Sequence, residues 1–248
     1  RPVLRAGAAA VAVTPVVEGF EDLDGDRTRD KDEPFDDVDG DGEWDAVWIA
    51  GFGAERAAQG VHDDIWARAL VIERADVRIA VVAVDWVGLQ HDQALAYRKT
   101  ALQADPALDH LLVSCTHNHE GPDTMGIWGG LVHPGVDPAY MQWAGERIQQ
   151  AVAQATERLA PVRVVAGRGR TEGLTHDSRL PEVKDEQVLA LRFDRTDGTG
   201  TEALVVHWSN HPEVLGGSQQ QITADFPHYL IERLEGEIPE AVGIYWQG

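Results

Sequence analysis

The chain has 248 residues, enough for one large domain or two small ones with a buried core. Its 42 acidic residues against 21 basic ones give a formal net charge of −21, which argues against nucleic acid as a partner, because nucleic-acid binders need a basic face to neutralise phosphates. The apolar runs are far shorter than the ~20 residues of a membrane helix, so no transmembrane segment is expected, and the single cysteine, Cys115, excludes an internal disulfide framework.

The two ends of the sequence suggest that it is a part of something longer. The chain opens at Arg1 with no Met and no apolar leader, so we expect a leader that was removed or a start that was trimmed. Gly243–Gly248 has the pattern of a strand that stops abruptly. We therefore expect the intact protein to continue past Gly248, or to be cleaved there and to keep its C-terminal fragment as a second chain.

Apolar and polar segments alternate along the chain as in an α/β domain. Asp137 is suited to cap a helix and Pro138 to fill its first position, and apolar residues then recur on one side from Met141 to Leu159. We predict a single domain over residues 1–248, with a mixed β-sheet core flanked by helices. The predicted strands cover 5–14, 65–73, 78–85, 110–115, 162–169, 187–194, 202–208 and 241–247, and the predicted helices cover 91–104, 138–159 and 225–236.

Residues 18–45, named here the acidic segment, differ from the rest of the chain. They contain 14 acidic and three basic residues, so we expect a surface insertion with little that enters a core. Calcium loops place oxygen ligands at positions 1, 3, 5, 9 and 12, with a Gly at 6. The second half of the segment has the first four ligands and the Gly but has Trp48 at position 12, whereas the first half has all five ligands and an early Gly.

These two partial matches predict an acidic insertion that binds Ca²⁺ in a structural role, because crowded carboxylates are costly unless a cation neutralises them. The alternative is a merely solvated acidic loop. The predicted ligands are Asp22, Asp24, Asp26, Asp30 and Glu33 in the first loop, and Asp37, Asp39, Asp41 and Asp45 in the second.

Histidines occur in two segments where an apolar strand runs into a polar loop. The first segment, residues 113–122, includes His117 and His119, and the second, residues 203–217, includes His207 and His211. Functional side chains gather at strand ends of α/β sheets, and imidazoles from two such ends could share one zinc ion. Hydrogen-bonded structural histidines are the alternative. His207 precedes the turn into the loop, so we expect it to pack rather than to bind metal.

Several short motifs follow one another in a recognisable order. They are Gly60-Val-His62-Asp63, Thr116-His117-Asn118-His119-Glu120-Gly121-Pro122, Asn210-His211-Pro212 and Ile222-Thr-Ala-Asp225. On these motifs the chain resembles the N-terminal catalytic domain of the neutral/alkaline, non-lysosomal ceramidases and looks like one of their bacterial relatives. The resemblance covers nearly all of the chain outside the acidic segment, and residues 116–122 are its most specific part.

The resemblance implies roles for individual residues. His117 and His211 correspond to zinc ligands, His119 to a histidine beside the metal that bonds the reacting water or the substrate, and Arg179 to an arginine that contacts the substrate. The family's remaining ligands, a Glu and a Tyr, correspond to positions beyond this chain. His62 and Asp85 could orient a ligand or the water, or could be ordinary residues at strand ends.

Several residues depart from the family motif, and the departures put the identity of the substrate in question. Asn118 stands where the family has Thr, Glu120 stands where it has Ser, and Asp123-Thr124 stand where it has small glycines. Glu120 could serve as an added acid or base, but we expect an exposed carboxylate at the rim of the site, because glutamate is seldom buried.

These features predict a zinc-dependent hydrolase, in the first place an amidase that cleaves N-acyl, ceramide-like bonds with metal-activated water. His119, with an ordinary pKa near ~6.5, would protonate the leaving amine, and Arg179 would hold a polar substrate group. The alternatives are a zinc hydrolase of another amide, an ester or a lactone, and a non-catalytic calcium-stabilised binding module. The loop 125–131 could form part of a Trp-lined groove for a lipid. Calcium loops that fill at ~mM calcium favour a secreted, periplasmic or cell-surface protein.

Overall fold

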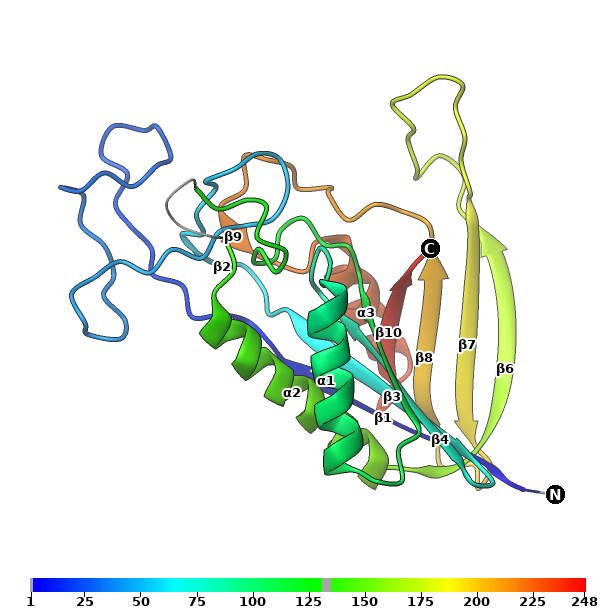
Figure 1. The fold of residues 1–248 in the computed structure, drawn as a ribbon. Helices are drawn as coiled ribbons and strands as arrows, with labels where there is room; N and C mark the ends of the chain where they lie inside the picture. Colours follow the sequence, from blue (N-terminus) through cyan, green and yellow to red (C-terminus); the bar gives the residue numbers. More distant parts are fainter. Residues whose placement is uncertain (1, 131–134) are drawn as a thin grey trace.

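The computed structural model describes residues 2–130 and 135–248 and centres on a mixed β-sheet (Figure 1). Eight strands form the sheet in the order β10-β8-β7-β6-β1-β3-β4-β5. The pairs β4–β5 and β8–β10 are parallel, and the other neighbouring pairs are antiparallel. The strands are β1 Leu4–Ala12, β3 Trp66–Arg74, β4 Val77–Val84, β5 His110–Cys115, β6 Ala160–Arg170, β7 Gln187–Arg195, β8 Thr201–Trp208 and β10 Val242–Gln247.

Two helices, α1 (His91–Ala104) and α2 (Pro138–Glu157), cover one face of the β1-β3-β4-β5 half of the sheet (Figure 1). The Asp137 carboxylate caps α2 by accepting the N–H of Ala139 at 2.7 Å. The predicted apolar stripe of α2 is buried against the sheet and consists of Met141, Ala144, Ile148, Ala151, Val152 and Ala155.

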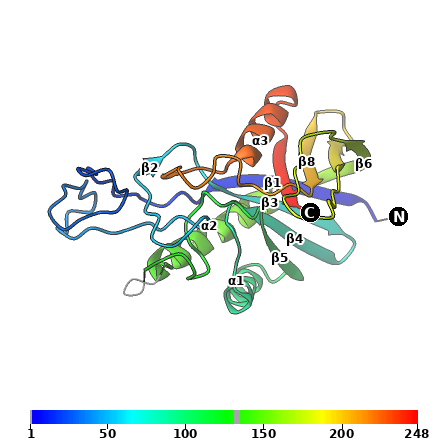
Figure 2. The same ribbon diagram turned by 90° about the horizontal axis from the view of Figure 1, so that it is seen from above.

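The third helix, α3 (Phe226–Glu237), lies on the opposite side of the sheet, against β8 and β10 (Figure 2). Ile231 of α3 packs on Trp208 and Tyr245, both buried. The remaining apolar side chains of this face join strands from both halves of the sheet in one cluster that includes Leu70, Phe193 and Ile244. Side chains therefore pack on both faces of the sheet. The loops at the ends of its strands are the part of the molecule that can present exposed side chains.

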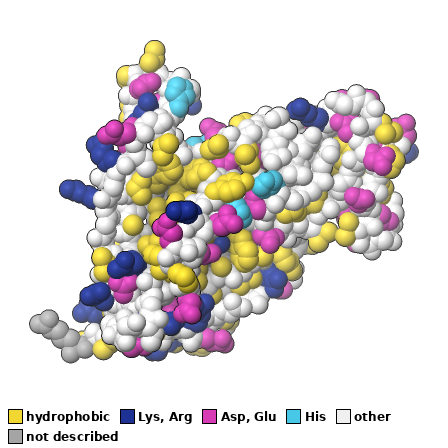
Figure 3. All heavy atoms as spheres, turned by 180° about the vertical axis from the view of Figure 1, so that it is seen from behind, with side chains coloured by type: hydrophobic (Ala, Val, Ile, Leu, Met, Phe, Trp, Pro, Cys, Tyr) yellow, Lys and Arg dark blue, Asp and Glu magenta, His cyan; other side chains and the backbone are white. Residues whose placement is uncertain are grey.

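The acidic segment extends away from the sheet without helix or strand (Figure 1). It has a small aromatic centre, because the ring of Trp44 lies 5.6 Å from that of Phe20 and 6.1 Å from that of Trp48. Phe20 is 7 % exposed, so the segment builds a core of its own, which its composition does not suggest. Viewed from behind, acidic side chains gather at this end of the molecule (Figure 3).

The expected fold class, a mixed β-sheet flanked by helices, is confirmed. Each predicted strand and helix is present, with ends displaced by at most two residues. Sequence patterns missed one short parallel pair, β2 (Gly60–Val61) with β9 (Gln221–Ile222). The division into a single domain stays a prediction. Among the described residues, no helix combines the length and apolarity that crossing a bilayer requires.

Candidate metal centre

Two loops at one end of the sheet carry the histidines. Residues 116–124, the motif loop, follow β5, and residues 209–220, the His211 loop, follow β8. The side chains of Thr116, Asn118 and Glu120 are buried, whereas His117 and His119 are partly exposed. His117 has a φ of +66° and residues 119–120 form a turn, so the loop is not a strand, but its burial pattern still leaves both histidines on the outer side of the motif loop.

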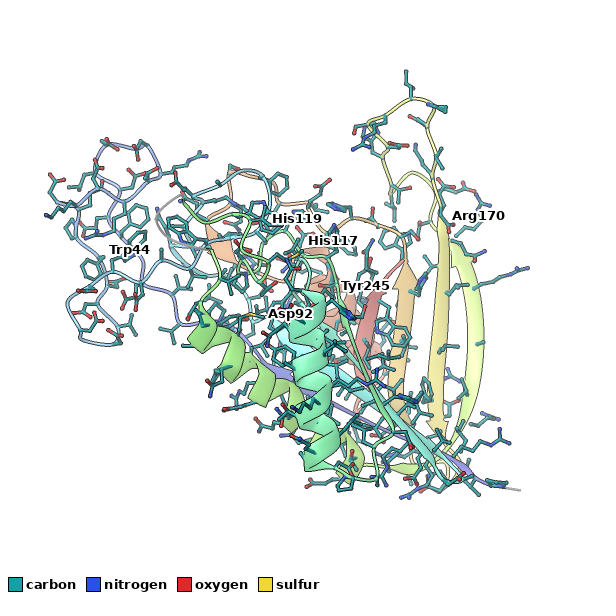
Figure 4. All side chains as sticks on the ribbon, in the orientation of Figure 1. Trp44, Asp92, His117, His119, Arg170 and Tyr245 are labelled. Carbon is teal, nitrogen blue, oxygen red and sulfur yellow. The ribbon has the colours of Figure 1, made fainter. Side chains whose placement is uncertain are left out.

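His117, His119 and His211 lie together in one cluster (Figure 4 labels the first two). The ring centre of His211 lies 4.7 Å from that of His117 and 4.6 Å from that of His119, and the latter two are 4.9 Å apart. One ring nitrogen of each histidine lies within 4.8 Å of the other two. The backbone N–H of His119 donates to the carbonyl of Pro212 at 3.1 Å, which ties the two loops together.

Neighbouring oxygens leave the same ring nitrogen free on two of the histidines. Nδ1 of His117 is hydrogen-bonded to the carbonyl oxygen of Val87 at 2.7 Å, and Nδ1 of His211 lies 3.0 Å from a carboxylate oxygen of Glu213. The Val87 carbonyl only accepts hydrogen bonds, so the ring proton of His117 belongs on Nδ1 and its lone pair on Nε2, and the negative charge of Glu213 favours the same proton position on His211. Histidine ligands of metals are characteristically oriented by such partners.

His119 is held by packing rather than by such a bond. A Cβ atom on Gly51 would lie 2.1 Å from Nδ1 of His119, so the ring packs directly on the glycine backbone. Gly51 also has a φ of +87°, a conformation that glycine adopts without strain. Nε2 of His119 is buried and has no hydrogen-bond partner among the described residues.

The environment of His119 lowers its pKa to about 4, chiefly because of burial and then because of His211, His117 and Arg56. At neutral pH the ring is therefore neutral and offers a lone pair. The pKa of His119 is thus lower than the ordinary value expected from the sequence, whereas its role in protonating a leaving amine stays a prediction. A neutral His119 is suited to accept a hydrogen bond or a proton instead.

The donor set fits a zinc ion. Zinc prefers neutral imidazole nitrogens. His117 offers Nε2 because its Nδ1 is bonded to Val87, and His211 offers Nε2 because its Nδ1 faces the carboxylate of Glu213. The buried Nε2 of His119 is an unpaired polar atom in the same cluster, and such atoms are rare in proteins unless an ion, water or ligand pairs with them.

Glu120 is not a carboxylate at the rim, so that expectation is wrong. Its side chain is fully buried, and Oε2 pairs with Nη1 of Arg56 at 2.8 Å. Burial raises the pKa of Glu120, and the paired Arg56 opposes this rise by favouring the charged carboxylate. Sequence reasoning missed Arg56, because nothing in the local pattern connects it to a residue 64 positions away.

Asn118 has a structural role that the family comparison does not reveal. Its Nδ2 donates to the carbonyls of Asp85 at 3.2 Å and Thr223 at 2.7 Å, and its Oδ1 accepts the N–H of Glu120 at 3.0 Å. An amide side chain supplies both donors and an acceptor, which the single hydroxyl of threonine cannot do. Asn118 thus joins the motif loop to β4 and to the segment after β9.

The other predicted site residues lie outside the cluster. Arg179 is exposed in the loop between β6 and β7, where its N–H donates to Asp177. His62 is 43 % exposed, and its Nδ1 lies 2.7 Å from the carboxylate of Asp63. Asp85 is buried behind the motif loop, and its carboxylate accepts the N–H of Trp66 at 2.9 Å. None of the described contacts joins these side chains to the three histidines.

Apolar side chains border the histidine cluster. The ring of Phe52 lies 5.9 Å from that of His119, and the ring of Trp128 lies 6.3 Å from it. Phe52 and Ile127 are 48 % and 57 % exposed, and Leu215 in the His211 loop is 39 % exposed. Trp128 and Ile127 belong to the loop 125–131 that was expected to favour a lipid, of which Leu131 lies outside the described residues.

In the acidic segment, the carboxylate of Glu33 accepts the N–H groups of Leu23 and Asp30 and lies with Asp22 and Asp24. The second loop lacks a glutamate at its end, but Glu18 takes the equivalent place from upstream. Its carboxylate accepts the N–H groups of Val38 and Asp45, at matching loop positions, and lies with Asp37 and Asp39.

Comparisons with known proteins gave matches among solved structures alone. A scan against protein-family models and a search of curated proteins gave no match. Among solved structures, the neutral ceramidase from Pseudomonas aeruginosa superposes with a TM-score of 0.77 at 18 % identity, over 100 % of this chain and 38 % of that one. A ceramidase complexed with C2 gives a TM-score of 0.76, also at 18 % identity and with the same coverage. The chain thus spans under two-fifths of the length of either structure, and the likeness shows a shared fold.

Proposed function

We propose that the chain is the N-terminal catalytic part of a zinc-dependent hydrolase that cleaves the amide bond of N-acylated, ceramide-like lipids. The observation that carries the proposal is the convergence of three imidazoles at the ends of β5 and β8. His117 is oriented by a hydrogen bond from Nδ1, Nδ1 of His211 lies beside the carboxylate of Glu213, and Nε2 of His119 is buried and unpaired. The similarity to ceramidases in fold supports the same chemistry.

In this proposal His117 and His211 hold the zinc ion through Nε2. Zinc in such a site acidifies water and polarises a carbonyl group. Val87 and Glu213 keep the two ligand rings in the required tautomer. His119, neutral at pH 7, accepts a hydrogen bond or a proton from the attacking water.

The border of the site supports an apolar substrate. The rings of Phe52 and Trp128 both lie beside the ring of His119. An acyl chain bound across His119 would therefore lie close to both aromatic rings. Exposed Ile127 and Leu215 extend this border, and burying one such side chain against an acyl chain contributes about 1.5–3 kcal/mol. Arg179 remains the proposed contact for a polar substrate group, from the loop between β6 and β7.

Metal analysis and hydrolysis assays test the proposal together. We expect about one zinc per chain by elemental mass spectrometry, lost in His117→Ala and His211→Ala but kept in His207→Ala, the matched control at the end of β8. A fluorescent N-acylsphingosine, its ester analogue and an acyl lactone then separate the amidase from the alternative hydrolases. A chain that binds no zinc, or whose zinc survives both substitutions, contradicts the proposal.

For the acidic segment we propose two calcium sites, the second completed by Glu18. The two glutamates make corresponding hydrogen bonds, to the residues at positions 2 and 9 of their loops, which supports equivalent roles as the last ligand. Calcium would stabilise the segment and not take part in hydrolysis. Exposed calcium loops of extracellular proteins fill at the calcium concentration outside the cell. Calcium binding here would therefore fit a secreted, periplasmic or cell-surface protein.

A further inference from the structure

Arg56 is almost buried, with 8 % of its side chain exposed, and lies beneath the histidine cluster. Its Nη2 donates to the carbonyls of His119 at 2.6 Å and Ala50 at 2.8 Å. Its Nη1 donates to the carbonyl of Gln219 and to the carboxylate of Glu120, both at 2.8 Å. One guanidinium thus binds four acceptors from three separate segments.

Each of these acceptors belongs to a segment that places a histidine. His119 carries the ring with the unpaired Nε2, and Ala50 precedes the glycine on which that ring packs. Gln219 lies in the His211 loop, so Arg56 connects the backbone of His119 to the loop that carries His211. The planar, fixed fork of a guanidinium sets the separation of such acceptors more closely than a lysine ammonium does.

Glu120 serves as the counter-ion of Arg56 and has no route to a substrate. Its side chain has no exposed area, one oxygen is bonded to Arg56, and the other has no described partner. Its carboxylate faces Arg56 in the interior, whereas His117 and His119 are partly exposed. The carboxylate therefore balances the buried charge of Arg56 and does not act as an acid or base.

We infer that Arg56 is a positioning residue that fixes His119 relative to His211, with Glu120 as its buried counter-ion. The inference rests on the proposed metal centre. A purely structural ion pair would affect stability alone, because disrupting it leaves a poorly paired buried charge without moving the histidines. A positioning pair also sets how tightly, and in what geometry, the histidines hold a metal ion.

The test measures zinc affinity by competition with a chromophoric chelator, and the visible absorption of the Co²⁺-loaded chain. Arg56→Lys keeps the charge but reaches fewer acceptors, so we expect about tenfold weaker zinc binding and a changed cobalt spectrum. The double variant Arg56→Met with Glu120→Met leaves no unpaired buried charge. We expect its stability in urea to recover toward that of the wild type, whereas its zinc affinity stays lower than that of the wild type.

Arg195→Lys is the matched control. Arg195 pairs with Glu202, which is also fully buried, at the opposite end of the sheet from the histidines. This variant is expected to lose stability while zinc affinity and the cobalt spectrum stay as in the wild type. Wild-type affinity and spectrum in either folded Arg56 variant overturn the inference, whereas a wild-type chain that binds no metal overturns the proposed function and the inference with it.

Discussion

Replacing Gly51 with alanine tests whether the packing of His119 matters for the cluster. The new Cβ would lie 2.1 Å from Nδ1 of His119, and ordinary contact begins near 3.4 Å, so the ring has to move by more than 1 Å. Displacements of about 1 Å in a catalytic group cost ~10²-fold in rate. We therefore expect amide hydrolysis to fall about 10²-fold and zinc affinity about tenfold in Gly51→Ala.

The same substitution also strains the backbone, so a control has to separate the two effects. Gly198, in the turn between β7 and β8, has a φ of +80°, close to the +87° of Gly51, and its added Cβ would meet nothing within 4 Å. Both variants are expected to lose about 1–2 kcal/mol of unfolding free energy in urea, from the left-handed backbone. Only Gly51→Ala is expected to slow hydrolysis and to weaken zinc binding. Equal hydrolysis rates in the two variants would refute the assigned contact, because His119 is proposed to act on the attacking water.

Further predictions concern calcium, pH and the substrate. At a calcium concentration 100-fold above Kd, each occupied site is expected to add about 2.7 kcal/mol to the unfolding free energy. Calorimetric titration should show that Glu18→Gln and Glu33→Gln each lose one calcium site. The control Glu43→Gln should lose none. Burial raises the pKa of Asp85 to about 6. Because the folded state then binds the proton more tightly, the contribution of Asp85 to stability is largest below pH ~4 and is lost as pH rises through 6, and Asp85→Asn should remove about 3 kcal/mol of pH dependence, measured by urea unfolding. Phe52→Ala should raise KM about tenfold for a long acyl chain and much less for a short one, in steady-state assays.

The elements of the fold follow from local patterns. The apolar stripe from Met141 to Ala155 predicts α2 and its buried face, and Asp137 predicts where it begins. The strand that leads to His117 is equally evident, because an unbroken apolar run ends at a polar loop. Functional side chains at strand ends are general to α/β sheets, so the meeting of His117 with His211 could be expected before the sheet order was known.

The supports of the site could not be predicted in this way, because they are contacts between distant segments. Arg56 and Glu120 are 64 residues apart, and each taken alone has the composition of a surface residue. Glu18 lies 20 residues before the Val38 N–H that it accepts, on the wrong side of its loop for a sequence motif to include it. The short pair β2–β9 is likewise too brief to leave a periodic signal.

The alternation along the motif loop changes the meaning of its departures from the ceramidase pattern. Asn118 and Glu120, two of the unusual residues, are buried and bond to the protein, and the unusual Asp123 and Thr124 are buried as well, whereas His117 and His119 are partly exposed. Buried residues determine how the loop is held, since they have almost no exposed area with which to touch a substrate. The departures therefore bear on the support of the histidines, and Arg56 accompanies one of them as its counter-ion. Selectivity for a substrate has to come from exposed residues beside the cluster, of which Phe52 is the nearest with a measured ring contact to His119.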